Sequence, residues 1–185
     1  MLITKTSKKL LVKLLKNNGD CMEKWFLYDK DRNPLNKTVE RDSLLLKGEF
    51  HLSVHAWIKC EDKYLIFQRD ETKKIFPNFY EPIAGGVDGE EDSFMAIVRE
   101  VKEESGLTVD ASNLLKKFSV VNDTCKYPEI CDVFIFELKF DLSDIRYEKG
   151  KNKNAKLVNK GEIIQMINDK EFLPLVIYKD QIESF

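Results

Sequence analysis

The sequence predicts an α/β (α+β) protein in which a mixed central sheet is covered by helices on both sides. Strand-like and helix-like segments follow one another in an order that mixes hairpins with crossover helices. The chain has 185 residues, of which 43% are hydrophobic and 34% are charged, which is enough for one hydrophobic core. No repeat and no Pro- or Ser-rich linker interrupts it, so we expect a helical extension at 1–20 followed by a single domain at 21–185.

The first forty residues predict a short helix and then a hairpin. Leucines recur at helix spacing across 10–15 with a lysine between them, and Asn-Asn-Gly at 17–19 predicts the end of this helix. We interpret it as a helix docked on the domain, and the alternative is a segment that binds a membrane surface or a partner. Residues 25–29 are strand-like, and the Asp, Asn and Pro residues of 29–34 are typical of a turn.

The middle of the chain predicts two strands, a glycine loop and a long helix. Residues 51–58 and 64–69 are strand-like and are separated by a polar turn. The glycines of 85–89 predict a tight loop. Asp92 is the expected N-cap of a helix that runs to Glu104 or Ser105, and Gly106 is placed to end it.

The remaining elements alternate again. They are strands near 118–121 and 133–140, a loop rich in Lys and Asn at 147–154, a strand at 155–158 and a helix at 161–168.

Composition and charge exclude several classes of protein. Thirty Lys and Arg residues against 32 Asp and Glu residues give a net charge of -2, which does not favour nucleic acid or an acidic membrane as a partner. The four cysteines lie far apart without a CxxC pair, so we expect reduced, mostly buried thiols rather than a zinc ribbon or a redox site. The sequence lacks the pattern of a signal peptide and of a membrane span, which predicts a cytoplasmic protein.

Three glutamates in the expected helix are the first sign of chemistry. Glu100, Glu103 and Glu104 stand at i, i+3 and i+4, which predicts three carboxylates on one helix face. Such like charges need a compensating cation, either Lys and Arg side chains or a divalent metal, and Mg²⁺ prefers carboxylate oxygens. The alternative is an ordinary solvated acidic face.

The spacing around these glutamates is that of a known motif. Glycine at 85, Glu91, Arg-Glu at 99–100, Glu-Glu at 103–104 and Gly-Leu at 106–107 stand at the fixed positions of the Nudix box, so the chain resembles the Nudix hydrolase superfamily at 85–107. The lead-in at 67–86 is also similar. One difference is that the glycine normally found just before Glu91 stands one position early, at Gly89. The resemblance implies a Nudix-type α/β/α sandwich with a loop-helix-loop catalytic motif.

Residues 25–29, 37–41, 51–57 and 129–134 line up with the N-terminal hairpin, the first core strand and a later strand of one Nudix branch. Over about 22–175 the chain is therefore similar to the branch that contains isopentenyl-diphosphate isomerase and related hydrolases. The isomerases have Cys-Gly-His in the loop where this chain has Ala84-Gly85-Gly86, which disfavours an isomerase because the proton relay lacks an agent. A second alternative is a non-catalytic Nudix module that senses a ligand. All the box glutamates are present, which disfavours this alternative too.

The resemblance implies a Mg²⁺-dependent pyrophosphohydrolase, with Mn²⁺ as a substitute, in which water attacks phosphorus in a diphosphate linkage of a nucleoside diphosphate derivative or a similar small metabolite. It assigns metal binding to Glu100, Glu103, Glu104 and the carbonyl of Gly85. Either Glu103 or Glu104 is the general base. It also assigns ion pairing within the site to Arg99, with Glu91 or Glu103 as its partner. Glu129 stands where the isomerase branch has a metal-binding glutamate, and the alternative is a solvated acid on an edge strand.

Substrate contacts are expected from residues outside the box. Arg69 and Lys74 are candidates for the diphosphate, whereas Phe79 and Tyr80 either line the leaving-group pocket or cover the sheet. His51 and His55 are expected to point to the same side of a strand, and we interpret them as core or pocket-lining groups rather than metal ligands. The lysines at 151, 153 and 156 either steer an anionic substrate or form a solvated loop. The resemblance is also compatible with a homodimer.

Overall fold

The computed structural model describes residues 24–89, 91–147, 150–174 and 177–185. The expected extension at 1–20, Cys21, Glu90 and Glu148 lie outside this part. In chain order the described elements are β1 (Lys24–Tyr28), β2 (Pro34–Glu40), β3 (His51–Cys60), β4 (Lys63–Arg69), β5 (Tyr80–Glu81), β6 (Ile83–Gly86), α2 (Ser93–Ser105), η1 (Ala111–Asn113), β7 (Leu114–Asn122), β8 (Glu129–Glu137), η2 (Leu142–Asp144), β9 (Asn152–Val158), α3 (Lys160–Asn168) and α4 (Lys179–Ile182).

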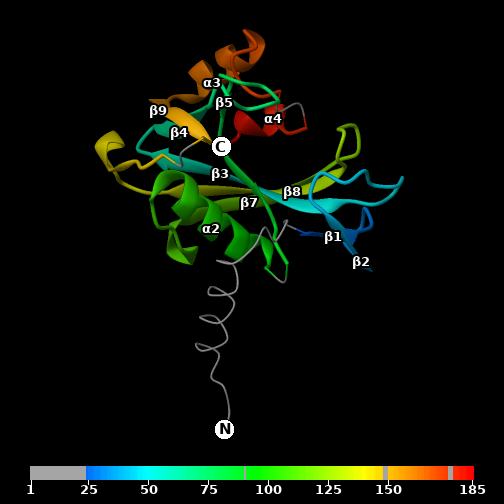
Figure 1. Cartoon of the computed structure of the whole chain (residues 1–185). Helices are drawn as coiled ribbons and strands as arrows, with labels where there is room; N and C mark the ends of the chain where they lie inside the picture. The colour runs from blue at the N-terminus through cyan, green and yellow to red at the C-terminus, as the bar shows by residue number, and fades with distance from the viewer. Residues whose placement is uncertain (1–23, 90, 148–149, 175–176) are drawn as a thin grey trace.

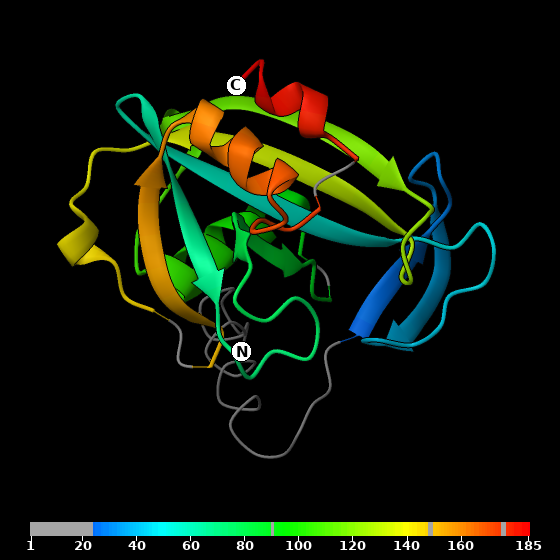
Figure 2. The same ribbon diagram turned by 90° about the horizontal axis from the view of Figure 1, so that it is seen from above.

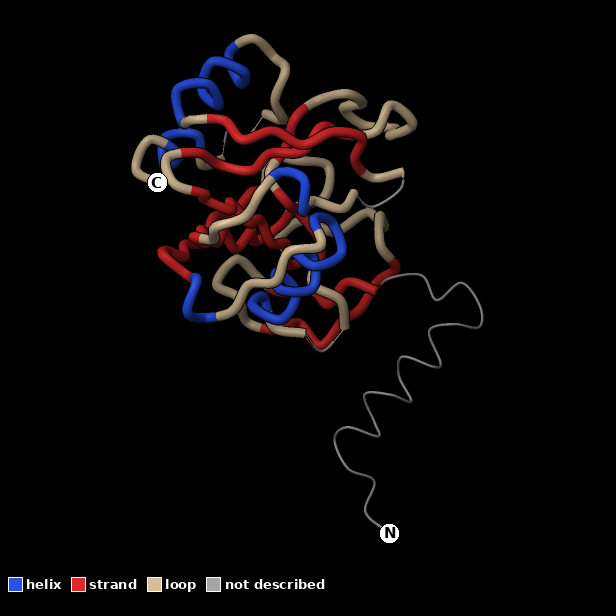
Figure 3. Tube along the Cα trace, turned by 90° about the vertical axis from the view of Figure 1, so that its left-hand side faces the viewer, coloured by secondary structure: helices blue, strands red, loops and turns tan. Residues whose placement is uncertain are grey.

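The predicted fold class is confirmed. Strand β3 pairs in parallel with β8 and antiparallel with β4 and β6, so the sheet is mixed. Helix α2 lies on one side of this sheet, and α3 and α4 lie on the other (Figures 1 and 3).

Strand β3 supplies both hydrophobic cores because alternate side chains of a strand point to opposite faces. Val54, Ala56 and Ile58 are fully buried in the core beneath α2. Trp57 is fully buried in the second core, together with Ile163 of α3. A strand buried on both faces reads as a nearly continuous apolar run, which is why this segment was recognisable in the sequence.

One edge of β3 is divided between two neighbours. Residues 53–56 pair with β6, in a register that places Val54 opposite Gly85. Residues 58–60 pair instead with the start of β4, which then continues along β9 over 64–69. The sheet is therefore forked at this edge, and β6 occupies the fork.

The predicted hairpin at the start of the domain is confirmed as β1 and β2, which form a separate two-stranded sheet. Two backbone hydrogen bonds of 2.8 and 2.9 Å between Tyr28 and Phe50 join it to the rest of the chain. It lies at one end of the molecule, away from α3 and α4 (Figure 2).

Several predicted strand boundaries are wrong. Strand β7 begins at Leu114 rather than near 118, and β8 ends at Glu137 rather than at 140. Strand β8 begins at Glu129 rather than near 133, because Asp132 looks like a polar interruption but is fully buried and neutralised by Arg32 at 2.6 Å. Strand β9 begins at Asn152, inside the stretch expected to be a loop. The Asn152 side chain is buried and donates a hydrogen bond to Glu104. Glu104 is distant in the sequence, so the local pattern does not reveal this contact.

Candidate active site

Helix α2 carries most of the candidate site, and both of its predicted ends are confirmed. The Asp92 side chain accepts a 2.8 Å hydrogen bond from the Met95 amide, which satisfies a free donor of the first turn. Gly106 has φ 75° and its amide donates to the Lys102 carbonyl. A residue with a side chain would be strained in this left-handed conformation, so glycine ends the helix here.

The three helix glutamates differ in their surroundings. Glu100 and Glu104 are buried, with relative exposures of 6% and 1%, whereas the Glu103 side chain is 52% exposed. Two of the three carboxylates therefore do not belong to a solvated acidic face. A buried carboxylate is costly unless cations and hydrogen-bond donors surround it.

Strand β6 approaches Glu100 so closely that any side chain at position 85 would displace the Glu100 carboxyl group. A Cβ atom built on Gly85 would lie 2.1 Å from both Cδ and Oε1 of Glu100. The pairing of β6 with β3 fixes this backbone, so Gly85 and Glu100 are held in contact.

Arg99 links three glutamates of the box. Its guanidinium donates to Glu91 (3.0, 3.2 and 2.9 Å), to Glu100 (2.6 Å) and to Glu103 (3.2 Å), and its Nη2 also donates to the Gly86 carbonyl (3.0 Å). Burial lowers the pKa of Arg99, but the hydrogen bonds to Glu91 and Glu100 outweigh it, so the pKa is raised and the group stays charged.

The start of β9 brings a second cation to the helix. Lys151 Nζ lies 3.2 Å from Glu100 Oε2 and 2.9 Å from Glu104 Oε1. Glu104 also accepts hydrogen bonds from Asn152 Nδ2 (3.2 Å) and from the Ala84 amide (3.3 Å). Burial raises the pKa of Glu104 to about 7 even though Lys151 lowers it.

A fourth carboxylate, Glu81 of β5, was not a candidate in the sequence. It is buried (4% exposed) and pairs with Arg69 Nη1 at 2.7 Å. Burial raises the pKa of Glu81, and the charge of Arg69 opposes this rise. Arg69 also donates to the carbonyls of Ile75 (2.9 Å) and Phe76 (3.1 Å), so its guanidinium anchors the loop between β4 and β5.

The structure places the other expected substrate contacts in different surroundings. Lys74 is exposed in the loop between β4 and β5, and Phe79 is half-buried with its ring centroid 5.2 Å from that of Phe76. Tyr80 belongs to the second core, and Lys156 Nζ lies 4.5 Å from its ring centroid.

His51 and Glu129 lie side by side on β3 and β8. The His51 ring stacks on Trp25 with centroids 3.9 Å apart, and its Nδ1 lies 3.0 Å from the Pro128 carbonyl. Glu129 accepts a 3.2 Å hydrogen bond from Asn122. Burial lowers the pKa of His51, with the nearby Glu129 opposing it, so the imidazole is neutral at neutral pH.

The helix carboxylates have the right chemistry for a hard divalent cation. Carboxylate and carbonyl oxygens are the ligands that Mg²⁺ prefers, and Glu100, Glu103, Glu104 and Gly85 supply them. Across the described parts of the chain, no three His, Cys, Asp or Glu side chains are arranged to hold one ion together. Arg99 and Lys151 neutralise the carboxylates in this arrangement.

Residues 49–175 match the family model of the NUDIX domain. The chain belongs to the Nudix family. It is 33% identical over 155 residues to the uncharacterized Nudix hydrolase lin0387 of Listeria innocua, which covers 83% of this chain and 89% of that protein. The uncharacterized Nudix hydrolase lmo0368 of Listeria monocytogenes is 34% identical, with the same coverage. Nudix hydrolases act on diphosphate bonds of small molecules, so the predicted superfamily and enzyme class are confirmed.

Solved structures show the same fold at low identity. The DR0079 protein of Deinococcus radiodurans superimposes with a TM-score of 0.64 at 16% identity, over 81% of this chain and 91% of that one. A MutT protein of Methanosarcina mazei gives 0.58 at 20% identity, over 72% and 90%. An Ap4A hydrolase of C. elegans gives 0.55 at 18% identity, over 71% and 92%.

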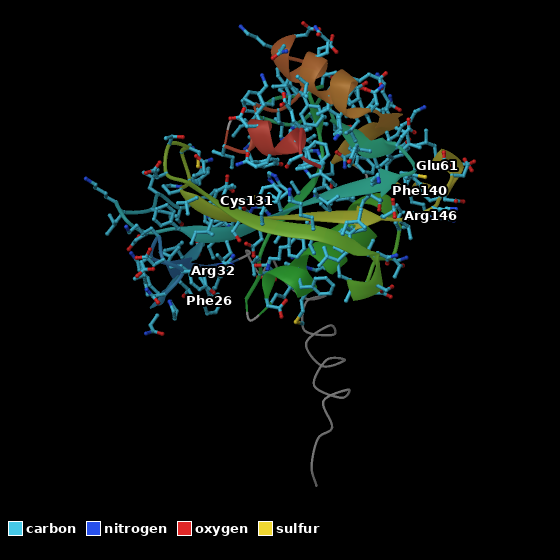
Figure 4. All side chains as sticks on the ribbon, turned by 180° about the vertical axis from the view of Figure 1, so that it is seen from behind. Phe26, Arg32, Glu61, Cys131, Phe140 and Arg146 are labelled. Carbon is cyan, nitrogen blue, oxygen red and sulfur yellow. The ribbon has the colours of Figure 1, made fainter. Side chains whose placement is uncertain are left out.

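The short strand β6 lacks the groups that a proton relay needs. Its Ala84-Gly85-Gly86 segment carries neither a thiol nor an imidazole. Cys131 lies on β8 in the middle of the sheet (Figure 4), where it is fully buried and burial raises the pKa of its thiol. A buried neutral thiol is a poor proton donor or acceptor, which argues against isomerase chemistry. Cys60 and Cys125 are half-buried, and these three thiols are free.

No helix within the described residues is both long and apolar enough to cross a membrane.

Proposed function

We propose that the chain is a Mg²⁺-dependent pyrophosphohydrolase that cleaves the diphosphate linkage of a nucleoside diphosphate derivative or a similar small phosphorylated metabolite. One observation carries the proposal: two buried carboxylates, Glu100 and Glu104, are held on α2 against the backbone of the glycine strand β6. Burying two neighbouring carboxylates carries a large desolvation cost, which supports a functional use for their charge.

We assign the metal to Glu100, Glu103, Glu104 and the Gly85 carbonyl. When bound, Mg²⁺ neutralises phosphate charge and lowers the pKa of an attacking water, and Mn²⁺ supplies the same chemistry. Glu103 is the better candidate for the general base, because its side chain is 52% exposed and open to water. Glu104 is already engaged by Lys151, Asn152 and the Ala84 amide, which suits a fixed ligand.

The remaining residues have positioning and substrate tasks in this proposal. Arg99 orients Glu91, Glu100 and Glu103 by donating to each of them. Arg69 positions the loop between β4 and β5 through its carbonyl contacts, and that loop offers exposed Lys74 to the phosphates. The half-buried ring of Phe79 is offered to the leaving group.

The experiment incubates the protein with a panel of nucleotide sugars, dinucleoside polyphosphates, dinucleotide coenzymes and nucleoside triphosphates, and separates the phosphomonoester and pyrophosphate products by anion-exchange chromatography. Each compound is assayed with Mg²⁺, with Mn²⁺ and with EDTA. We expect EDTA-sensitive cleavage of one class, restored by excess Mg²⁺. Isopentenyl diphosphate is included, and its conversion to the allylic isomer would contradict the hydrolase proposal. Cleavage that persists in EDTA would remove the metal from the mechanism.

A further inference from the structure

Lys151 is the least expected member of the candidate site. It belongs to a loop that reads as solvated in the sequence, yet its side chain is only 25% exposed and reaches two buried carboxylates of α2. Its ammonium lies between Glu100 Oε2 at 3.2 Å and Glu104 Oε1 at 2.9 Å. These two oxygens come from residues one helical turn apart, so a single small cation can bridge them.

The metal that the proposed function assigns to Glu100 and Glu104 would compete with Lys151 for the same carboxylates. An ammonium donates hydrogen bonds to carboxylate oxygens at about 2.9 Å, whereas Mg²⁺ binds them at about 2.1 Å and carries twice the charge. Both cations cannot occupy the space between Glu100 and Glu104, because they would repel each other at contact distance.

The backbone around Lys151 is anchored on both sides, so a displaced ammonium stays close. The Lys151 carbonyl accepts a 3.0 Å hydrogen bond from the Asp70 amide, and the next residue, Asn152, donates to Glu104 at 3.2 Å. A change of partner therefore requires only a rotation of the four-carbon side chain, whose short reach keeps the charge close to the two glutamates.

We propose that the Lys151 ammonium and the metal ion bind alternately between Glu100 and Glu104. Metal binding displaces the ammonium, which then contacts the diphosphate of the substrate. The inference rests on the proposed function. Without metal, Lys151 neutralises the buried carboxylates and keeps the site folded. With metal, the same charge meets the phosphate oxygens, so one lysine serves both states of the enzyme.

The test compares Mn²⁺ affinity in the absence of substrate, by electron paramagnetic resonance at pH 8.5, where the carboxylates are ionised. Lys151→Met keeps the length of the side chain and removes its charge. Lys153→Met is the matched control, because it makes the same change in net charge two residues away, where the lysine contacts Asn78 and the exposed Glu71. We expect Lys151→Met to bind Mn²⁺ at least about tenfold more tightly than wild type, the effect that an adjacent charge has on a carboxylate. Lys153→Met should match wild type.

Turnover supplies the second readout. At saturating Mg²⁺ we expect Lys151→Met to lose at least about tenfold in kcat/KM while it gains metal affinity, because the substrate has lost a cation. A purely structural lysine would lower both quantities, and that result overturns the proposal. Unchanged or weaker Mn²⁺ binding by Lys151→Met overturns it as well, and unchanged turnover removes the contact with the substrate.

A measurement on the wild-type protein guards against a misfolded variant. The Lys151 ammonium, held by two carboxylates, should give an observable ¹H–¹⁵N signal that is lost or shifted when Mg²⁺ is added. A signal that does not respond to bound Mg²⁺ overturns the inference alone. If wild type binds no metal at all, the proposed function fails together with it, so the two failures are distinguishable.

Discussion

Replacing Gly85 by alanine tests the contact between strand β6 and the helix glutamates. The added Cβ would lie 2.1 Å from Cδ and Oε1 of Glu100, whereas ordinary contact begins at 3.4 Å. The Glu100 carboxyl group must therefore retreat by about 1.3 Å, since the β6 backbone is fixed in register opposite Val54. A misplacement of about 1 Å in a catalytic group costs on the order of 100-fold in rate.

We expect Gly85→Ala to lose at least about 100-fold in metal-dependent kcat/KM. The loss of stability should be small, about 1–2 kcal/mol, because the clash is with the end of a side chain rather than with backbone. Product formation under saturating Mg²⁺, followed by chromatography, and a thermal melt measure the two effects separately.

The neighbouring glycine offers a matched control. A Cβ on Gly86 would lie 3.6 Å from Trp25 Nε1, which is ordinary van der Waals contact. Gly86→Ala should therefore keep both its melting temperature and its kcat/KM close to those of wild type. If Gly85→Ala retained full activity, or if both variants failed equally, the reasoning from the Glu100 contact would be refuted.

Three other changes test the site and the core. Glu103→Gln should lower kcat about 100-fold or more with an unchanged melting temperature, since its side chain is 52% exposed, and a variant as active as wild type would remove Glu103 from the mechanism. Asp132→Asn should cost about 3 kcal/mol in urea unfolding at pH 7, because it removes the buried carboxylate that pairs with Arg32 at 2.6 Å. Although burial raises the pKa of Asp132, hydrogen bonds from Ser119, Ser93 and Arg32 lower it overall. The stabilisation by the Asp132 carboxylate is therefore present above about pH 4 and is lost as the pH falls through the folded-state pKa. A difference in unfolding free energy between variant and wild type that persists below that pKa would contradict the assignment. In the native protein, iodoacetamide should modify the half-buried Cys60 and Cys125 but spare the fully buried Cys131, and early labelling of Cys131 would count against its burial.

The local parts of the fold were readable from the sequence. The ends of α2 follow from Asp92 and Gly106, because capping chemistry acts within a few residues. The hairpin of β1 and β2 follows from its turn residues for the same reason. The motif likewise placed Arg99 among the glutamates of its own helix, which are its near neighbours in sequence.

Contacts between distant segments were not readable. Lys151 lies 51 residues from Glu100 along the chain, and nothing in its own lysine-rich stretch marks it as different from Lys153. Glu81 gave no signal either, because its burial depends on Arg69 and on the pairing of β4 with β5. Sequence patterns report local preference, whereas the cation that neutralises a buried carboxylate is chosen by the way the strands come together.

The fork at the edge of β3 separates the backbone beside the helix glutamates from the segment at 70–79. Gly85 is positioned by the pairing of β6 with β3, whereas the segment at 70–79 connects β4 to β5. If this segment contacts the substrate as proposed, insertions, deletions or new side chains in it can change which substrate is accepted while the backbone beside Glu100 keeps its place on β3. Substrate specificity can therefore evolve in such a protein while the geometry of the catalytic residues is retained.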